Sequence, residues 1–228
     1  MFVVLLFAAA INAPAPLEII KTAVQLSEKT DRLRQNYSMT QETISRSPGK
    51  ESRKTYEMTF RNGKPYRKMV LKDGQPVNGK SEIYTSSEER RFEMLRELPK
   101  ALDYSHAGEE VIDGEECWVL SAKPKPGYDP PSMSTKFLTQ MHAKVWISKK
   151  HHRMLKLDAI SVGPVSLGGF LAKFEKGTRI QLEQVKVDEN VWLPSRFKMT
   201  YDGRVLFKSI KGEIEQLSTN FRKINSTT

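Results

Sequence analysis

The residues of this chain that could do chemistry are scattered, and none of them forms a recognisable catalytic group. The Gly-x-Ser-x-Gly pattern of serine hydrolases is absent from the 228 residues. The acidic pairs Glu109-Glu110 and Glu115-Glu116 flank an Asp-Gly turn, which is typical of solvated turn charge and not of a general acid with its base. The sequence therefore predicts a protein that is not an enzyme and has no catalytic residue.

The types and spacing of the residues also disfavour a metal site, a reactive thiol and a phosphate-binding loop. The pair His151-His152 stands among Lys and Arg side chains, which repel a cation, and adjacent histidines on a strand point to opposite sides. Cys117 is the only cysteine, so no internal disulfide forms, and its apolar surroundings predict a buried strand thiol. The Gly-rich stretch 163–177 lacks the Gly-Lys-Ser/Thr of a phosphate loop. No metal and no cofactor are implied.

What the sequence does specify is a set of long strands. Between Arg179 and Thr200, apolar and polar residues alternate on either side of the turn Asp188-Glu189-Asn190, which predicts a β-hairpin. A second hairpin is predicted at the Asn62-Gly63 turn. Similar runs recur from Asn36 to Phe221 and favour one large antiparallel sheet.

Two segments have helical spacing instead. The first is Pro16–Gln35, where proline suits the first turn, and the second lies between Ser81 and Leu102, with Pro99 as its predicted end. The stretch from Ser161 to Thr178 is expected to be irregular, and strands are expected near Arg204–Ile210 and Gly212–Phe221. No internal repeat or linker interrupts the chain, which favours a single domain over residues 16–228.

The chain begins with ten apolar residues followed by small residues and prolines. This pattern predicts a secretory signal peptide over residues 1–15, although no Lys or Arg precedes the apolar run. The alternative is a buried N-terminal strand. With a signal peptide, the protein is periplasmic or otherwise exported.

Positive charge is concentrated early in the chain. The formal net charge is +10, and residues 46–72, here called the basic meander, hold nine Lys or Arg against two Glu. Several of these basic side chains share an outward face, and Arg53, Lys64, Arg67 and Lys68 are expected to point outward, where they could contact an anionic membrane surface. A merely solvated face is the alternative. No recognition helix or RNA-binding signature is present, so nucleic acid is not an expected partner.

Several segments together resemble a known family. These are the leader and first helix, the meander with Gly63-Lys64-Pro65-Tyr66-Arg67, the Pro-rich loop 123–134, Lys144–Ile147, Gly168–Ala172 and Val191–Ser195. The chain resembles an uncharacterised exported bacterial branch of proteins similar to the outer-membrane lipoprotein-sorting (LolA/LolB-like) family. The resemblance implies an α+β fold, in which a curved antiparallel sheet forms a half-open barrel wrapped around helices on its concave face.

The resemblance also implies an apolar cavity between sheet and helices that holds acyl chains. Aromatic and methionine side chains on the strands are the candidate lining, because they offer large and adaptable apolar area: Tyr56, Met58, Phe60, Met69, Leu71, Trp118, Leu120, Trp146, Phe197 and Met199. The alternative is that the two helices simply fill this face. Phe170, Leu171 and Phe174 are a candidate lid over the cavity, or else part of an ordered structural loop.

The function expected on this basis is binding of an apolar ligand, a lipid or a lipoprotein acyl chain, in trafficking to the outer membrane. The alternative is an envelope sensor or protein-interaction module on the same fold, which binds another envelope protein and carries no cargo.

Overall fold

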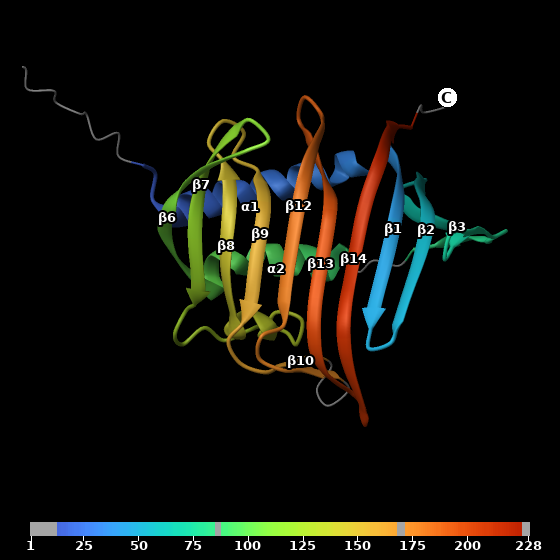
Figure 1. Cartoon of the computed structure of the whole chain (residues 1–228). Helices are drawn as coiled ribbons and strands as arrows, with labels where there is room; N and C mark the ends of the chain where they lie inside the picture. The colour runs from blue at the N-terminus through green and yellow to red at the C-terminus, as the bar shows by residue number, and fades with distance from the viewer. Residues whose placement is uncertain (1–12, 85–87, 168–171, 225–228) are drawn as a thin grey trace, which may run out of the picture.

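A computed structural model describes residues 13–84, 88–167 and 172–224, and it is built on one antiparallel sheet with helices on one side (Figure 1). The strands follow the order β4-β3-β2-β1-β14-β13-β12-β9-β8-β7-β6, and β5, β10 and β11 attach beside this path. Strands β4 and β6 end the path without pairing to each other, so the sheet is curved and open, as predicted.

The elements have the following bounds. The helices are α1 (Pro16–Arg34), α2 (Glu88–Ala101) and the 3-10 helix η1 (Lys136–Gln140). The first seven strands are β1 (Tyr37–Ser47), β2 (Lys50–Arg61), β3 (Lys64–Lys72), β4 (Gln75–Pro76), β5 (Ser81–Ile83), β6 (Leu102–Ile112) and β7 (Glu115–Pro124). The others are β8 (Met141–Ser148), β9 (Met154–Ser161), β10 (Val165–Leu167), β11 (Ala172–Phe174), β12 (Arg179–Asp188), β13 (Val191–Val205) and β14 (Lys208–Lys223).

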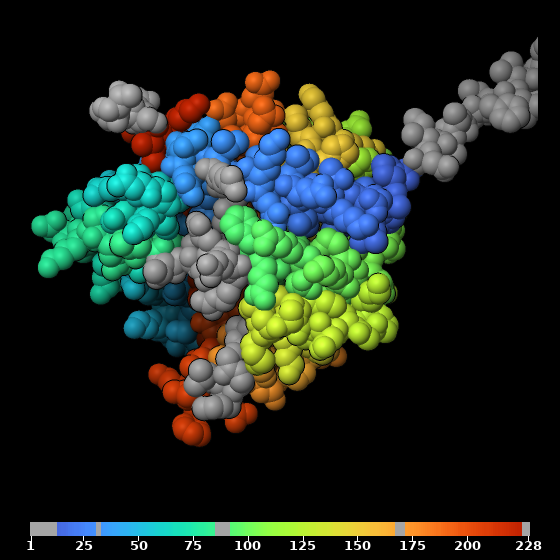
Figure 2. Space-filling model, turned by 180° about the vertical axis from the view of Figure 1, so that it is seen from behind, coloured from blue at the N-terminus to red at the C-terminus, as the bar shows by residue number. Residues whose placement is uncertain are grey.

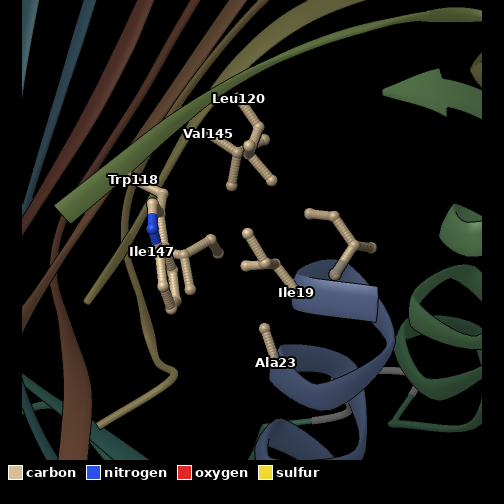
Figure 3. Packing of buried hydrophobic residues seen from close by; sticks show 7 residues of the cluster. Ile19, Ala23, Trp118, Leu120, Val145 and Ile147 are labelled. Carbon is tan, nitrogen blue, oxygen red and sulfur yellow. The ribbon is translucent and has the colours of Figure 1, made fainter. Parts of the chain in front are cut away.

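Helix α1 begins at Pro16 and ends one residue before the predicted boundary. Its residues Ile19, Ile20 and Ala23 lie at helical spacing and are buried, which gives the helix one apolar face. This face packs against four buried side chains of the sheet, Trp118, Leu120, Val145 and Ile147, which point toward the helix (Figure 3). The sheet face that carries them is called the inner face below.

Helix α2 lies beside α1 over the same face, with the residues of η1 beyond it (Figure 2). It begins at Glu88 and continues past Pro99 to Ala101, so the prediction that Pro99 ends the helix is wrong. A proline this close to the helix end removes only its own backbone hydrogen bond. The last turn then packs into the sheet, because Ala101 and Leu102 share a buried cluster with Ala122 and Leu138.

The outer face carries a second apolar cluster, made by residues that alternate with those facing α1. Cys117, Val119, Trp146 and Leu155 are all buried there together with Trp192. Ile112 packs on this cluster from the tip of the β6–β7 hairpin, which curls over the outer face at the upper edge of Figure 1. Burial, with help from nearby Glu115, raises the pKa of Cys117 to about 11, and the predicted buried strand thiol is confirmed.

Two strand boundaries near the chain end differ from expectation. The stretch 161–178, expected to be irregular, contains the short strands β10 and β11. Strand β11 pairs with β13 beside Gly203, where a Cβ atom would lie 2.3 Å from the Lys173 carbonyl oxygen, so only glycine fits. The expected strand 204–210 is instead broken by a tight turn at Leu206-Phe207.

Candidate functional site

The inner face is organised in cross-strand rows, and the central row runs across the sheet from β7 to β2. Residues directly opposite each other on paired strands point to the same face. By this rule Leu120, Val145, Leu157, Leu182 and Phe197 form one continuous apolar row from β7 to β13. The row then turns polar, with Gln216, Thr43 and Lys54 on β14, β1 and β2.

The burial of this row changes along its length. Leu120, under α1, is fully buried, whereas Leu182 and Phe197 are only partly buried. The next row carries the same trend, because Ile180, Met199 and Ile214 pair across β12, β13 and β14 and are also partly buried. These five residues are called the inner patch: Ile180, Leu182, Phe197, Met199 and Ile214. They are apolar surface on the concave side that α1 and α2 do not fully bury.

The residues proposed from sequence as a cavity lining separate into two groups. Phe197 and Met199 belong to the inner patch. Tyr56, Met58, Phe60 and Met69 gather on β2 and β3 instead, with Met58 buried opposite Met39 and Tyr56 opposite Met69. Three polar residues of the same face, Gln41, Thr43 and Gln216, stand between the two groups.

The remaining lining candidates do not face an open cavity in this structure. Trp118 and Leu120 are 8% and 0% exposed and pack directly on α1. Trp146 lies on the outer face, so its placement with Trp118 is wrong, and its indole N–H donates to Glu110 Oε2 at 2.8 Å. Leu71 pairs with Thr55 and therefore lies on the opposite face from Tyr56, which corrects its placement too.

The candidate lid is described only in part. Phe170 and Leu171 lie outside the described residues. Phe174 lies in β11, where it packs on the cluster of Met141, Ala159 and Val165 and meets the ring of Tyr201 edge-on at 6.1 Å. This side chain is thus part of the packed floor beside the inner patch.

The basic meander is only partly free to contact a surface. Arg53 pairs with Glu51 at 2.8 Å on the outer face. Arg67, predicted to point outward, instead shares the inner face with Met58, where it pairs with Glu82 at 2.7 Å and lies over the rings of Tyr56 and Tyr84. Lys64 and Lys68 lie opposite Arg61 and Glu57, and no ion pair holds either lysine within the described part of the chain.

Directly behind the inner patch, the outer face carries a network of ion pairs. Arg196 pairs with Glu215 at 2.8 Å, Lys198 pairs with Glu213 at 2.8 Å, and Arg46 bridges both carboxylates at 2.6 and 3.2 Å. Burial opposes ionisation of Glu215, but hydrogen bonds from Arg196 and Arg46 outweigh it and lower its pKa. The hydrogen bond from Lys198 lowers the pKa of Glu213 in the same way. At β13 and β14 the sheet is therefore apolar on its inner face and charged on its outer face.

This network predicts loss of stability in acid. A carboxylate whose pKa is lower in the folded chain than its ordinary 4.5 stabilises the fold above that pH, and this contribution is lost as pH falls through the folded pKa. We expect the melting temperature to be nearly constant from pH 7 to 5 and to fall below about pH 4.5. At pH 7 the Glu215→Gln variant should have a lower melting temperature than the wild type. Its melting temperature should also change less as the pH falls, as measured by calorimetry. An unchanged melting temperature at pH 7 would mean that the network adds no stability.

Other polar groups make no site. His151 lies 3.3 Å from Glu115 and stacks on Trp192, while His152 contacts the ring of Trp118. In the described ranges, no three His, Cys, Asp or Glu side chains come together as metal ligands. Among the described residues, no helix is long and apolar enough to cross a membrane.

Two shallow hollows lie elsewhere on the surface. One of about 460 Å³ lies between the β6–β7 tip and β12–β14, and it is lined partly by Asp113, Val185 and Phe221. Another of about 370 Å³ lies along α2 at Phe92 and Arg96. Neither contains a residue of the inner patch. Ile180, Leu182 and Ile214 were missing from the expected lining, although the alternation of Ile180 and Leu182 with polar residues is visible in the sequence.

Comparison with known proteins finds similarity at the level of solved structures. No family model matches the sequence, and no curated protein matches it significantly. A LolA superfamily protein from Nitrosomonas europaea is 13% identical with a TM-score of 0.42, over 95% of this chain and 96% of that one. A putative outer membrane lipoprotein-sorting protein domain from Vibrio parahaemolyticus is 12% identical with a TM-score of 0.41, over 92% and 95% of the two chains.

A third similar structure is the complex of MucA and MucB from Pseudomonas aeruginosa, with 9% identity, a TM-score of 0.32 and coverage of 92% and 99%. The first two of these structures are similar to this chain over nearly its whole length.

Proposed function

We propose that this protein binds an apolar ligand, a lipid or a lipoprotein acyl chain, on the inner face of its sheet. The observation that carries the proposal is the inner patch. Five apolar side chains on three adjacent strands remain partly exposed on the concave side of the sheet, where a packed core would bury them.

The chemistry of the inner patch suits a flexible hydrocarbon. No charged side chain stands among its five members, and the central row continues from Phe197 through the neutral polar residues Gln216 and Thr43 before it reaches Lys54. Met199 adapts its shape to an irregular partner, and Phe197 supplies a broad flat contact. An acyl chain lying along β12–β14 would bury apolar area on both sides, which is worth about 0.8 kcal/mol for each methylene removed from water.

The protein is proposed to act in the bacterial envelope, in lipid or lipoprotein trafficking to the outer membrane. The apolar run over residues 1–10, which lies outside the described residues, supports export. The second candidate is an envelope sensor or interaction module that uses the same patch for a partner protein. Its support is the dense packing of Trp118 and Leu120 on α1, which closes the β7–β8 part of the inner face to a cargo.

Two measurements test the proposal. Protein purified from an envelope fraction is extracted with organic solvent and the extract is analysed by mass spectrometry, with an unrelated exported protein as the control. Separately, a dansyl-labelled undecanoic acid is titrated into delipidated protein, and its fluorescence should rise and saturate at one equivalent. A lipid-free extract together with no saturable probe binding would reject the carrier and favour the sensor.

A further inference from the structure

The end of the longest hairpin presents apolar side chains to solvent with no partner. Strands β13 and β14 are joined at Val205, Leu206 and Phe207, which we call the hairpin tip. Phe207 is 99% exposed, Leu206 is 52% exposed and Val205 is 40% exposed. At the lower edge of Figure 1 the β13–β14 hairpin extends beyond the ends of the other strands. The tip is therefore the outermost part of the described molecule on this side.

The residue types at the tip are not those that favour a tight turn. Other hairpins of this chain turn on Asn62-Gly63, Asp73-Gly74 and Asp113-Gly114, whose residues tolerate positive φ. At the tip the chain places Leu206 at a φ of 53°, a left-handed conformation that a branched side chain adopts only at a cost. The sequence thus accepts backbone strain and exposed apolar surface at one point, a combination that marks functional positions.

The charge around the tip indicates what it meets. Arg204 and Lys208 flank the three apolar residues and are exposed, and neither has a carboxylate partner in the described part of the chain. Lys173 lies opposite Arg204 on β11, and Lys211 follows on β14. Within the described residues, Glu175 pairs with Lys173 at 3.9 Å and Asp202 pairs with Lys211 at 3.3 Å, and neither carboxylate pairs with Arg204 or Lys208.

We infer that the hairpin tip docks on the surface of an anionic phospholipid bilayer. An aromatic ring at the level of the headgroups with free basic side chains beside it is the arrangement that binds such an interface. Three apolar residues on a narrow turn are far too small for a stable protein interface, which needs many times this area. The membrane would thus be contacted by the hairpin tip and not by Lys64 and Lys68 of the basic meander. This contact does not depend on the proposed lipid-carrier function.

A tryptophan at the tip gives a direct test. The three native tryptophans are at most 8% exposed, so their emission is already that of buried indole. Phe207→Trp should emit as exposed indole in buffer and shift to shorter wavelength when vesicles of equal parts phosphatidylglycerol and phosphatidylcholine are added. Vesicles of phosphatidylcholine alone should give no shift at the same lipid concentration.

Variants separate the apolar and the charged contributions by vesicle sedimentation at low salt. Phe207→Ser should weaken binding to the anionic vesicles about tenfold, and each of Arg204→Gln and Lys208→Gln about fivefold. Val111→Ser, at the exposed tip of the β6–β7 hairpin, and the pair Lys64→Gln/Lys68→Gln are the matched controls and should bind like the wild type.

Three results would overturn the inference. The first is failure of the wild type to sediment with anionic vesicles at low salt, and the second is loss of binding by the Lys64→Gln/Lys68→Gln pair. The third is a shift of the Phe207→Trp emission with protein concentration in the absence of vesicles, which would assign the tip to a second copy of the chain. Saturable binding of the dansyl fatty acid by Phe207→Ser, measured in parallel, reports the carrier function separately.

Discussion

Replacing Trp118 by alanine should lower the free energy of unfolding by about 3–5 kcal/mol. Trp118 is 8% exposed and packs with Leu120 and Ile147 against the apolar face of α1 (Figure 3). Removing the indole leaves a cavity in the cluster through which α1 packs on β7 and β8. The loss should be accompanied by early melting of helix signal in circular dichroism.

Urea unfolding followed by circular dichroism measures this effect, with Val111→Ala as the control. Val111 is 68% exposed, so its truncation should change stability by less than about 0.5 kcal/mol. A Trp118→Ala protein that stays within 1 kcal/mol of the wild type and loses fatty-acid binding would show instead that Trp118 lines an open cavity. The expected result is the reverse, with large destabilisation and retained binding by the protein that is still folded.

The parts of the fold that follow directly from the sequence are those with one clear period. The hairpin from Arg179 to Thr200 alternates apolar and polar residues over most of its length and turns on polar residues, and the structure places β12 and β13 there. Helix α1 was bounded to within one residue because proline opens it and the period changes at Asn36. The open antiparallel sheet over inner helices follows from these elements and the resemblance.

The face of individual side chains was harder to predict, for two physical reasons. Val145-Trp146-Ile147 is apolar throughout, because both faces of the sheet are buried at this end, so alternation gives no sign that Trp146 points away from α1. On β3 a bulge opposite Thr55 and Tyr56 inserts one residue, so Met69 and Leu71 lie on opposite faces despite their even spacing. Bulges arise from local backbone geometry and leave no mark in residue type.

The sequence also did not predict the apolar hairpin tip or the inward position of Arg67. The tip at Leu206-Phe207 contains no turn former, so its apolar residues were expected to continue a strand. Arg67 was expected outside because it is charged, although it stands two residues before Met69 and therefore shares its face. Stacking on Tyr56 and Tyr84 and pairing with Glu82 stabilise this inward arginine, and such contacts join three separate strands or loops.

Replacing Phe197 and Met199 together by serine should weaken fatty-acid binding with only a modest loss of stability. Both side chains are only partly buried in the inner patch, so a smaller share of their area stabilises the fold. If an acyl chain covers them, the double variant loses about 2 kcal/mol of binding free energy, or roughly thirtyfold in the dissociation constant. Titration with dansyl-labelled undecanoic acid measures the change.

The strand itself offers a matched control. Lys198 stands between Phe197 and Met199 and points to the outer face, where it pairs with Glu213. Lys198→Gln should lower stability slightly through the ion-pair network and leave the probe affinity unchanged. Equal loss of affinity in both variants would mean that the whole strand was disturbed. Full affinity in the serine double variant would mean that the ligand binds outside the inner patch. Because successive residues of one strand are compared, the result separates the inner face from the outer face directly.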